Sequence, residues 1–236
     1  MLNEKIISSS GRAEVQVDPG LRAHMIRVYN NMFVGLLLTA LVAYFTSQSP
    51  SAVTFIAGNS LILGLVMLGM AIGFSFLVNR LSYVGLQLYF YGFAALFGAL
   101  TSVYLAVYTG ESVARAFVMT SALFGGLSLY GYTTKRDLTS MGTFLNVGLW
   151  VLIIGSLLNA FIFQSSAASM AMSAISLVIF TGLTAYDTQK IRDLYYSGVG
   201  HEDLQKLSIA GALTLYLDFI NMFLAMLRLF GNQRDD

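Results

Sequence analysis

Two aspartates, Asp187 and Asp218, lie inside long apolar segments of this chain. On insertion scales an aspartate at the centre of a membrane helix costs roughly 2.5 to 3.5 kcal/mol, so it usually faces other helices and has a partner there. Two carboxylates in one dry pocket cannot both ionise at low cost, so they share a proton or hold a cation, and calcium suits such hard oxygen ligands best. The pair therefore predicts a site that links protonation, cation binding and helix position. The alternative for Asp187 is a place at the membrane surface, paired with Lys190 or Arg192.

Several other polar residues could complete such a site. Arg80, at the end of an earlier apolar segment, is a candidate counter-charge because a guanidinium can bridge two carboxylates; its alternative role is an anchor at the membrane surface. Asn221 follows Asp218 by one helical turn and could supply a carbonyl ligand or a hydrogen bond. The further candidates are the hydroxyl groups of Tyr186 and Tyr216, which are alternatively packing aromatics, and Gln189, which could cap the site.

The elements that must position these residues follow from the composition. The chain is 56% hydrophobic and only 11% charged, whereas soluble domains carry about 25% charged residues. Its apolar residues form runs of about 20 without the alternation of barrel strands, which indicates membrane-spanning helices. We predict an all-α, polytopic membrane protein, a bundle of seven helices at residues 25–46, 53–78, 83–108, 113–133, 142–163, 168–189 and 207–229.

One transmembrane domain at residues 24–230 is expected, between a polar cytoplasmic arm at 1–23 and a short polar tail at 231–236. With the amino terminus in the cytoplasm, most lysines and arginines fall on the cytoplasmic side, as the positive-inside rule requires. The exceptions are Arg115, Arg228 and Arg234. A reading with six full spans and one re-entrant segment would instead place the carboxyl terminus inside.

Other protein classes are disfavoured by the same sequence. The absence of cysteine excludes disulfides and thiol chemistry, and a net charge of +1 gives no reason to expect nucleic acid. No cleavable signal peptide is evident. The short connections and the absence of sorting signals favour a bacterial inner membrane, with the lipid bilayer as partner. Small residues predict close helix packing at Gly69 and Gly73 on the second span and along the third, at Gly92, Ala94 and Gly98.

The segments Tyr186–Gln189 and Leu215–Phe223 resemble the paired motifs of the Bax inhibitor-1 family, also called the transmembrane Bax-inhibitor-motif family, and the bacterial branch in particular. The resemblance implies a bundle in which six helices surround the last. It also implies a pH-sensitive calcium leak channel, gated by an aspartate pair that Asp187 and Asp218 match, with no enzymatic activity and no cofactor besides the calcium ion itself. In bacterial relatives an arginine at the end of the second helix latches that pair. Here the latch falls on Arg80 or, aligned through Val84 and Gly85, on Asn79.

Two other functions stay open on the sequence. An intramembrane aspartyl protease also needs two aspartates on consecutive helices, but its second aspartate lies in a Gly-x-Gly-Asp sequence, whereas Leu215–Leu217 precede Asp218 here. A regulator of membrane proteolysis or of a stress response, which transports nothing, would instead have other membrane proteins as partners. Flux measurements, cleavage of a reporter peptide and co-purification from membranes distinguish the three.

Overall fold

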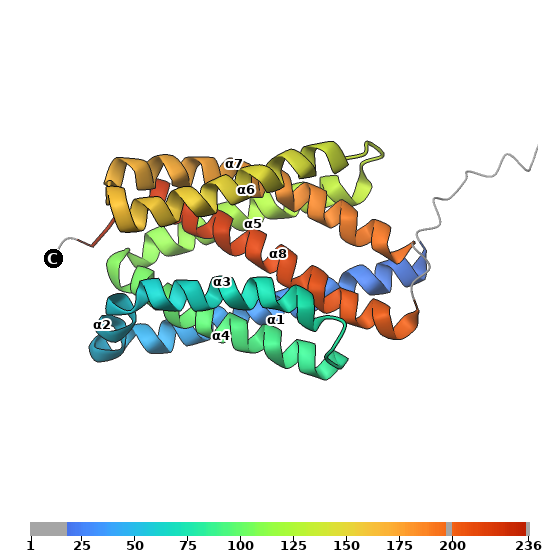
Figure 1. Ribbon diagram of the computed structural model, residues 1–236, viewed down its shortest axis with the longest axis horizontal. Helices are drawn as coiled ribbons and strands as arrows, with labels where there is room; N and C mark the ends of the chain where they lie inside the picture. The colour runs from blue at the N-terminus through green and yellow to red at the C-terminus, as the bar shows by residue number, and fades with distance from the viewer. Residues whose placement is uncertain (1–17, 197–199, 235–236) are drawn as a thin grey trace, which may run out of the picture.

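The computed structural model describes residues 18–196 and 200–234, which form an almost entirely helical bundle (Figure 1). In chain order its elements are α1 (Pro19–Ser47), α2 (Pro50–Gly58), α3 (Ser60–Leu77), α4 (Tyr83–Val107), α5 (Gly110–Thr133), α6 (Thr139–Leu158), the π-helical turn η1 (Asn159–Phe163), α7 (Ser166–Tyr195) and α8 (His201–Phe230).

Seven of the described helices are long and apolar enough to cross a membrane. The shortest of them, α3, has 18 residues, which at 1.5 Å per residue span about 27 Å, close to the thickness of a hydrocarbon core. Each predicted span overlaps one of these helices. The prediction of a seven-helix membrane protein is therefore confirmed.

The second predicted span, residues 53–78, is wrong in one respect because it consists of two helices. At Asn59 the backbone leaves the helical conformation, with φ −110° and ψ 10°. The Asn59 side chain donates to the Phe55 carbonyl at 2.8 Å and so competes with continued helix. With Gly58, a poor helix former, beside it, the chain turns there, and the short α2 lies across the end of α3 (Figure 1).

Helices α1, α7 and α8 extend beyond their predicted ends. Asp18 accepts a hydrogen bond from the Gly20 amide at 2.8 Å, and α1 starts at Pro19, so residues 19–23 of the predicted arm are helical. The loop expected between the last two spans shrinks to a few residues, because α7 continues to Tyr195 and α8 begins at His201. Charged side chains mark where the apolar segment ends, but they do not stop a helix.

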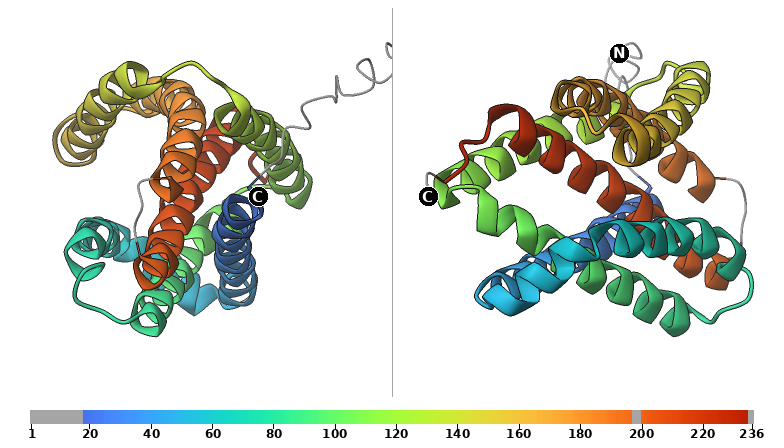
Figure 2. Two further views of the ribbon diagram at one scale, coloured as in Figure 1. Left: turned by 90° about the vertical axis from the view of Figure 1, so that its right-hand side faces the viewer. Right: turned by 60° about the vertical axis from the view of Figure 1, so that its left-hand side comes forward.

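Helix α8 is the centre of the bundle, as predicted for the last span. In its most apolar stretch 72% of the residues are buried, against 11–33% in the other six spans. Helices α1, α4, α5 and α7 pack directly on it, whereas α3 packs chiefly on α4 and α6 on α7. Figure 2 (left) shows α8, in red, crossing the middle of the bundle. The six other spans thus surround α8 in two tiers rather than in one ring.

Close approach of helix backbones is confirmed at only part of the predicted glycines. A Cβ at Gly98 on α4 would lie 2.6 Å from the Thr39 carbonyl oxygen of α1, so these two helices meet at that point. A Cβ at Gly69 or Gly92 would meet no described atom within 4 Å. The tightest approach was not predicted: at Gly131 on α5 a Cβ would overlap the Ala185 carbonyl oxygen of α7.

The end of the chain returns to the bundle beyond α8. The Thr109 amide donates to the Asn232 carbonyl at 3.1 Å, and the Arg234 amide donates to the Val107 carbonyl at 2.9 Å. The Asn232 amide also donates to the Ser112 hydroxyl at 2.9 Å. The described part of the polar tail therefore fastens the end of α8 to the connection between α4 and α5.

Candidate functional site

Asp187 and Asp218 come together at the contact between α7 and α8. These consecutive helices run in opposite directions and pack more extensively than α8 does with any other helix. Asp218 is only 3% exposed, and Asp187 is half-buried. Their carboxyl groups are close enough to interact with each other. The antiparallel arrangement of two neighbouring helices is what brings the two side chains to the same depth.

The surroundings of Asp218 leave its carboxyl group dependent on Asp187. Its Oδ2 atom is buried and has no hydrogen-bond donor among the described residues. Ionised carboxylates are only acceptors, so a hydrogen bond between two of them requires a proton on one. A lone buried carboxylate without a donor would be costly. The geometry therefore fits a pair that holds one proton between its two carboxyl groups.

The positive charge that acts on this pair comes from α7 itself. Lys190 lies one turn beyond Asp187, on the same side of the helix. Its positive charge interacts electrostatically with the Asp187 carboxyl group. The Lys190 ammonium is exposed and lies 5.9 Å from the centre of the Tyr186 ring. A flexible, solvated ammonium holds a carboxylate less firmly than a bidentate guanidinium does.

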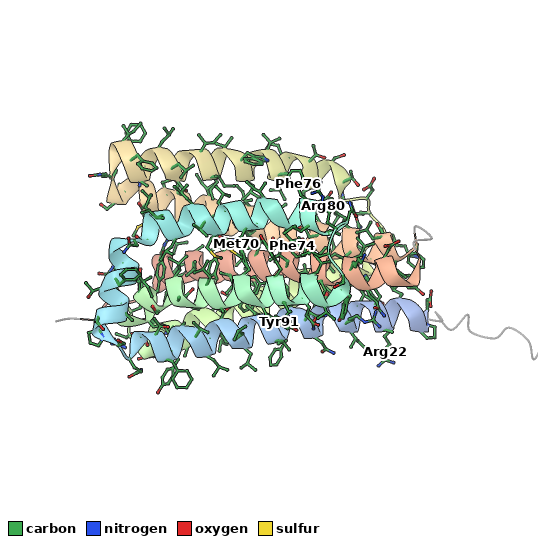
Figure 3. The ribbon with its side chains drawn as sticks, turned by 60° about the horizontal axis from the view of Figure 1, so that its bottom comes forward. Arg22, Met70, Phe74, Phe76, Arg80 and Tyr91 are labelled. Carbon is green, nitrogen blue, oxygen red and sulfur yellow. The ribbon has the colours of Figure 1, made fainter. Side chains whose placement is uncertain are left out.

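Arg80 and Asn79 are not brought to the aspartates. Both side chains are exposed, and in the described part of the chain the ion pairs are Arg115–Glu111 and Arg192–Asp193. Figure 3 shows Arg80 at the end of α3, toward the same end of the bundle as Arg22. Because α3 packs chiefly on α4 and α2, its end stays away from α7 and α8. The predicted latch is therefore not formed in this structure, whichever of the two residues is considered.

Tyr216 lies outside the polar pocket where it was expected. Its hydroxyl is 2.7 Å from the Thr39 hydroxyl, which itself donates to the Ala94 carbonyl at 2.9 Å. Thr39 has a single hydroxyl proton, so Tyr216 is the donor to it. Edge-to-face contacts with Phe90, Phe93 and Phe97 enclose the ring. Tyr216 therefore joins α8 to α1 and α4, and the packing alternative is the correct one.

Tyr186 and Gln189 also face away from the aspartates. The Tyr186 ring packs on Gly142 of α6, where a Cβ would overlap it. Gln189 accepts from the Leu138 amide at 2.9 Å and donates to the Arg136 carbonyl at 2.7 Å. It thereby holds the connection between α5 and α6 against α7, instead of capping the aspartate pair.

Asn221 remains beside Asp218, one turn further along α8. Its amide nitrogen donates to the Leu217 carbonyl at 2.8 Å, which leaves the side-chain oxygen as an available ligand. Among the described residues no group of three or more histidine, cysteine, aspartate or glutamate side chains could hold a metal ion. Calcium takes six to eight oxygen ligands, so an ion at the two aspartates would keep water or use carbonyl oxygens. This arrangement suits a transient ion better than a tightly held one.

A chain of hydroxyl groups beside the pair was not predicted. The Thr188 hydroxyl donates to the Thr184 carbonyl at 2.8 Å and accepts from Ser128 at 3.1 Å. Ser128 in turn lies 2.5 Å from the Tyr29 hydroxyl. Since each hydroxyl has one proton, the donors run from Tyr29 through Ser128 to Thr188, and they tie α1 and α5 to the residue next to Asp187. In the sequence, this hydroxyl chain was indicated only by the presence of a hydroxyl residue inside each of three apolar spans.

Comparison with known proteins shows the family to which this sequence belongs. Residues 21–235 match the sequence profile of the family described as inhibitor of apoptosis-promoting Bax1. The chain belongs to the Bax inhibitor-1 family. It is 43% identical over 225 residues to the inner membrane protein YbhL of Escherichia coli, which covers 93% of this chain and 96% of that protein. It is 47% identical over 220 residues to an uncharacterised protein of Rickettsia prowazekii, covering 92% and 93% of the two chains.

Membership of the Bax inhibitor-1 family agrees with the helices described above. A relative from Streptococcus pyogenes, 32% identical over 224 residues, is likewise named as a membrane protein. With seven helices that can cross a bilayer, this Bax inhibitor-1 protein is a multi-pass membrane protein. Neither the family's description nor the names of these relatives states an enzymatic activity.

Proposed function

We propose that this protein is a pH-sensitive leak channel for cations, calcium in particular, and that Asp187 and Asp218 are its pH sensor and gate. The observation that supports the proposal is the Asp218 carboxyl group, which is 3% exposed and whose Oδ2 atom is buried without a hydrogen-bond partner among the described residues. A buried group of this kind on the central helix makes helix packing depend on protonation.

The two protonation states of the aspartate pair differ in how α7 and α8 pack and in whether a cation lies between them. With one shared proton the pair carries less negative charge and does not hold a cation between α7 and α8, so the closed packing of these helices loosens. Without the proton, the two negative charges repel each other unless a cation takes its place; two unit charges at ~4 Å repel by roughly 4 kcal/mol at an effective dielectric constant of ~20. The ionised pair therefore binds calcium and retains it, whereas the protonated pair releases it.

The leak is fastest where the ion is bound weakly enough to leave the site. We therefore expect flux to increase as the pH falls and protons displace calcium from the pair. Because the latch by Arg80 or Asn79 is absent and Lys190 is the neighbouring cation, the closed packing depends mainly on the aspartates themselves. This proposal includes a cytoplasmic amino terminus, supported by the distribution of lysine and arginine, and a bacterial inner membrane, supported by the name of the relative from Escherichia coli.

Calcium flux into proteoliposomes tests the proposal. Vesicles that contain the purified full-length protein and a calcium-sensitive dye are compared with protein-free vesicles at pH 6, 7 and 8. The protein is expected to admit calcium faster than the protein-free vesicles at every pH, and fastest at pH 6. Flux equal to that of protein-free vesicles would contradict the channel, and flux without pH dependence would contradict the sensor.

A further inference from the structure

We propose that a groove between α1 and α5 binds one acyl chain of an anionic phospholipid, whose phosphate is held by Arg22. The groove has a volume of about 630 Å³. On α1 it is lined by Arg22, Met25, Ile26 and Tyr29, and on α5 by Phe124, Gly125, Ser128, Leu129 and Tyr132. None of these residues belongs to the aspartate pair, and the site is independent of whether the protein conducts ions.

The groove exists because α1 and α5 pack on each other far less than either packs on α8. Both helices rest on α8 instead, and among the described residues one hydrogen bond of 2.5 Å, between Tyr29 and Ser128, connects them. At Gly125 a Cβ would meet no described atom within 4 Å, so the wall is open there. The space is therefore a gap between two helices, which no described side chain fills.

The position of the groove favours a lipid chain as its occupant. Its outer edges are formed by Ile26 and Leu129, which are 47% and 63% exposed on the apolar surface of the bundle. From Arg22 to Tyr29 the groove follows α1 for about 10 Å at 1.5 Å per residue, a length that suits several methylene groups in a row. In a bilayer such an apolar slot is open to acyl chains from the side.

The positive charge of Arg22 favours a phospholipid with an anionic headgroup. Arg22 lines the groove near the start of α1, where its label stands in Figure 3. Its side chain is exposed, and in the described part of the chain no acidic residue forms an ion pair with it. A guanidinium at the level of the headgroups binds a phosphate bidentately. The second arginine nearby, Arg27, does not line the groove.

The floor of the groove connects the proposed lipid to the rest of the molecule. Tyr29 and Ser128 form part of it, and Ser128 continues to Thr188 at 3.1 Å. A bound chain therefore rests on the same hydroxyl groups that hold α1 and α5 to α7. Lipid binding is expected to stabilise the folded bundle, since it fills the one described gap between these two helices that opens on the membrane.

Native mass spectrometry of the full-length protein in detergent tests the site with phosphatidylglycerol and phosphatidylcholine of identical acyl chains. The wild type is expected to retain one phosphatidylglycerol at concentrations about fivefold lower than phosphatidylcholine, as one arginine at the headgroup level allows. Gly125→Leu places a side chain in the groove and should reduce retention of both lipids to background. Gly126→Leu is the matched control, because its Cβ also meets nothing within 4 Å but Gly126 does not line the groove.

Arg22→Gln alters only an exposed side chain and keeps the proposal testable if Gly125→Leu does not fold. It should abolish the preference for phosphatidylglycerol over phosphatidylcholine, whereas Arg27→Gln should leave it unchanged. Equal retention by the two glycine variants would overturn the groove as the binding site. An unchanged preference in Arg22→Gln would overturn the role of Arg22. No retained lipid in the wild type would overturn the proposal.

Discussion

A Gly131→Ala substitution is expected to lower the free energy of unfolding by about 1–3 kcal/mol, the usual cost of overpacking a tight contact. The added Cβ would overlap the Ala185 carbonyl oxygen. That atom belongs to the backbone of α7 and cannot turn aside as a flexible side chain would, so α5 must move away from α7. The contact lies beside Ser128 and Thr188, whose hydrogen bond of 3.1 Å is lost when the helices separate.

Gly126→Ala provides the control on the same helix. At this position a Cβ meets nothing within 4 Å, and replacing glycine by alanine inside a helix gains about 0.5–1 kcal/mol from backbone entropy. Thermal or denaturant unfolding in detergent should therefore move in opposite directions for the two variants. A Gly131→Ala protein as stable as Gly126→Ala would show that α5 and α7 do not approach each other as closely as described.

Asp187→Lys is expected to reduce calcium flux at least about tenfold at every pH from 6 to 8. The substitution replaces the shared proton by a permanent positive charge that pairs with Asp218 at every pH in this interval, so protonation can no longer release the contact between α7 and α8. At about 4 Å two opposite unit charges attract by roughly 4 kcal/mol at an effective dielectric constant of ~20, so this ion pair opposes opening by more than the 1.4 kcal/mol of a tenfold change. Flux into proteoliposomes measures the effect.

Asp137→Lys makes the same change of charge outside the membrane helices. Asp137 lies in the connection before α6, and hydrogen bonds from Thr139 hold the pKa of its carboxyl group below the usual range, so it is ionised throughout this pH interval. The calcium flux of the Asp137→Lys variant should stay within about twofold of the wild type. The reason is that salt screens an exposed charge within a Debye length of about 8 Å at physiological ionic strength. Equal losses in both lysine variants would mean that surface charge, and not the aspartate pair, controls flux.

The fold was largely predictable because membrane helices need long apolar segments, and these are visible as blocks of composition. The break at Asn59 was missed because Gly58 and Asn59 interrupt an otherwise apolar run without a charge. The central place of α8 came from the resemblance to a family. What no pattern in the chain showed is that α3 and α6 lie in an outer tier, since that depends on how helices far apart in sequence pack.

The candidate site was only partly predictable, for reasons of helix geometry. Asp187 and Asp218 could be paired because each stands alone among apolar residues on neighbouring helices. Tyr216 lies two residues before Asp218, which at about 100° per residue puts it on nearly the opposite face of α8. The same rotation separates Gln189 from Asp187, whereas Lys190 returns to the aspartate's side. Counting residues around each helix would have removed these two wrong candidates.

The prediction for Arg80 failed for a different reason. Its distance from the aspartates depends on the position of α3 relative to α8, which sequence spacing does not determine. The hydroxyl chain of Tyr29, Ser128 and Thr188 was overlooked because each residue is unremarkable alone, and only their meeting between three helices gives them a role.

The most direct test of the aspartate pair is the ratio of calcium flux at pH 6 to flux at pH 8, measured in proteoliposomes for the wild type, Asp187→Asn and Asp218→Asn. Asp137→Asn is the control with an altered carboxylate outside the site. If the two aspartates share the proton that sets the pH response, both variants at the pair should bring this ratio close to one, while Asp137→Asn should keep the wild-type ratio. Variants of Asp187 and Asp218 that retain the full pH dependence of the wild type would contradict the account.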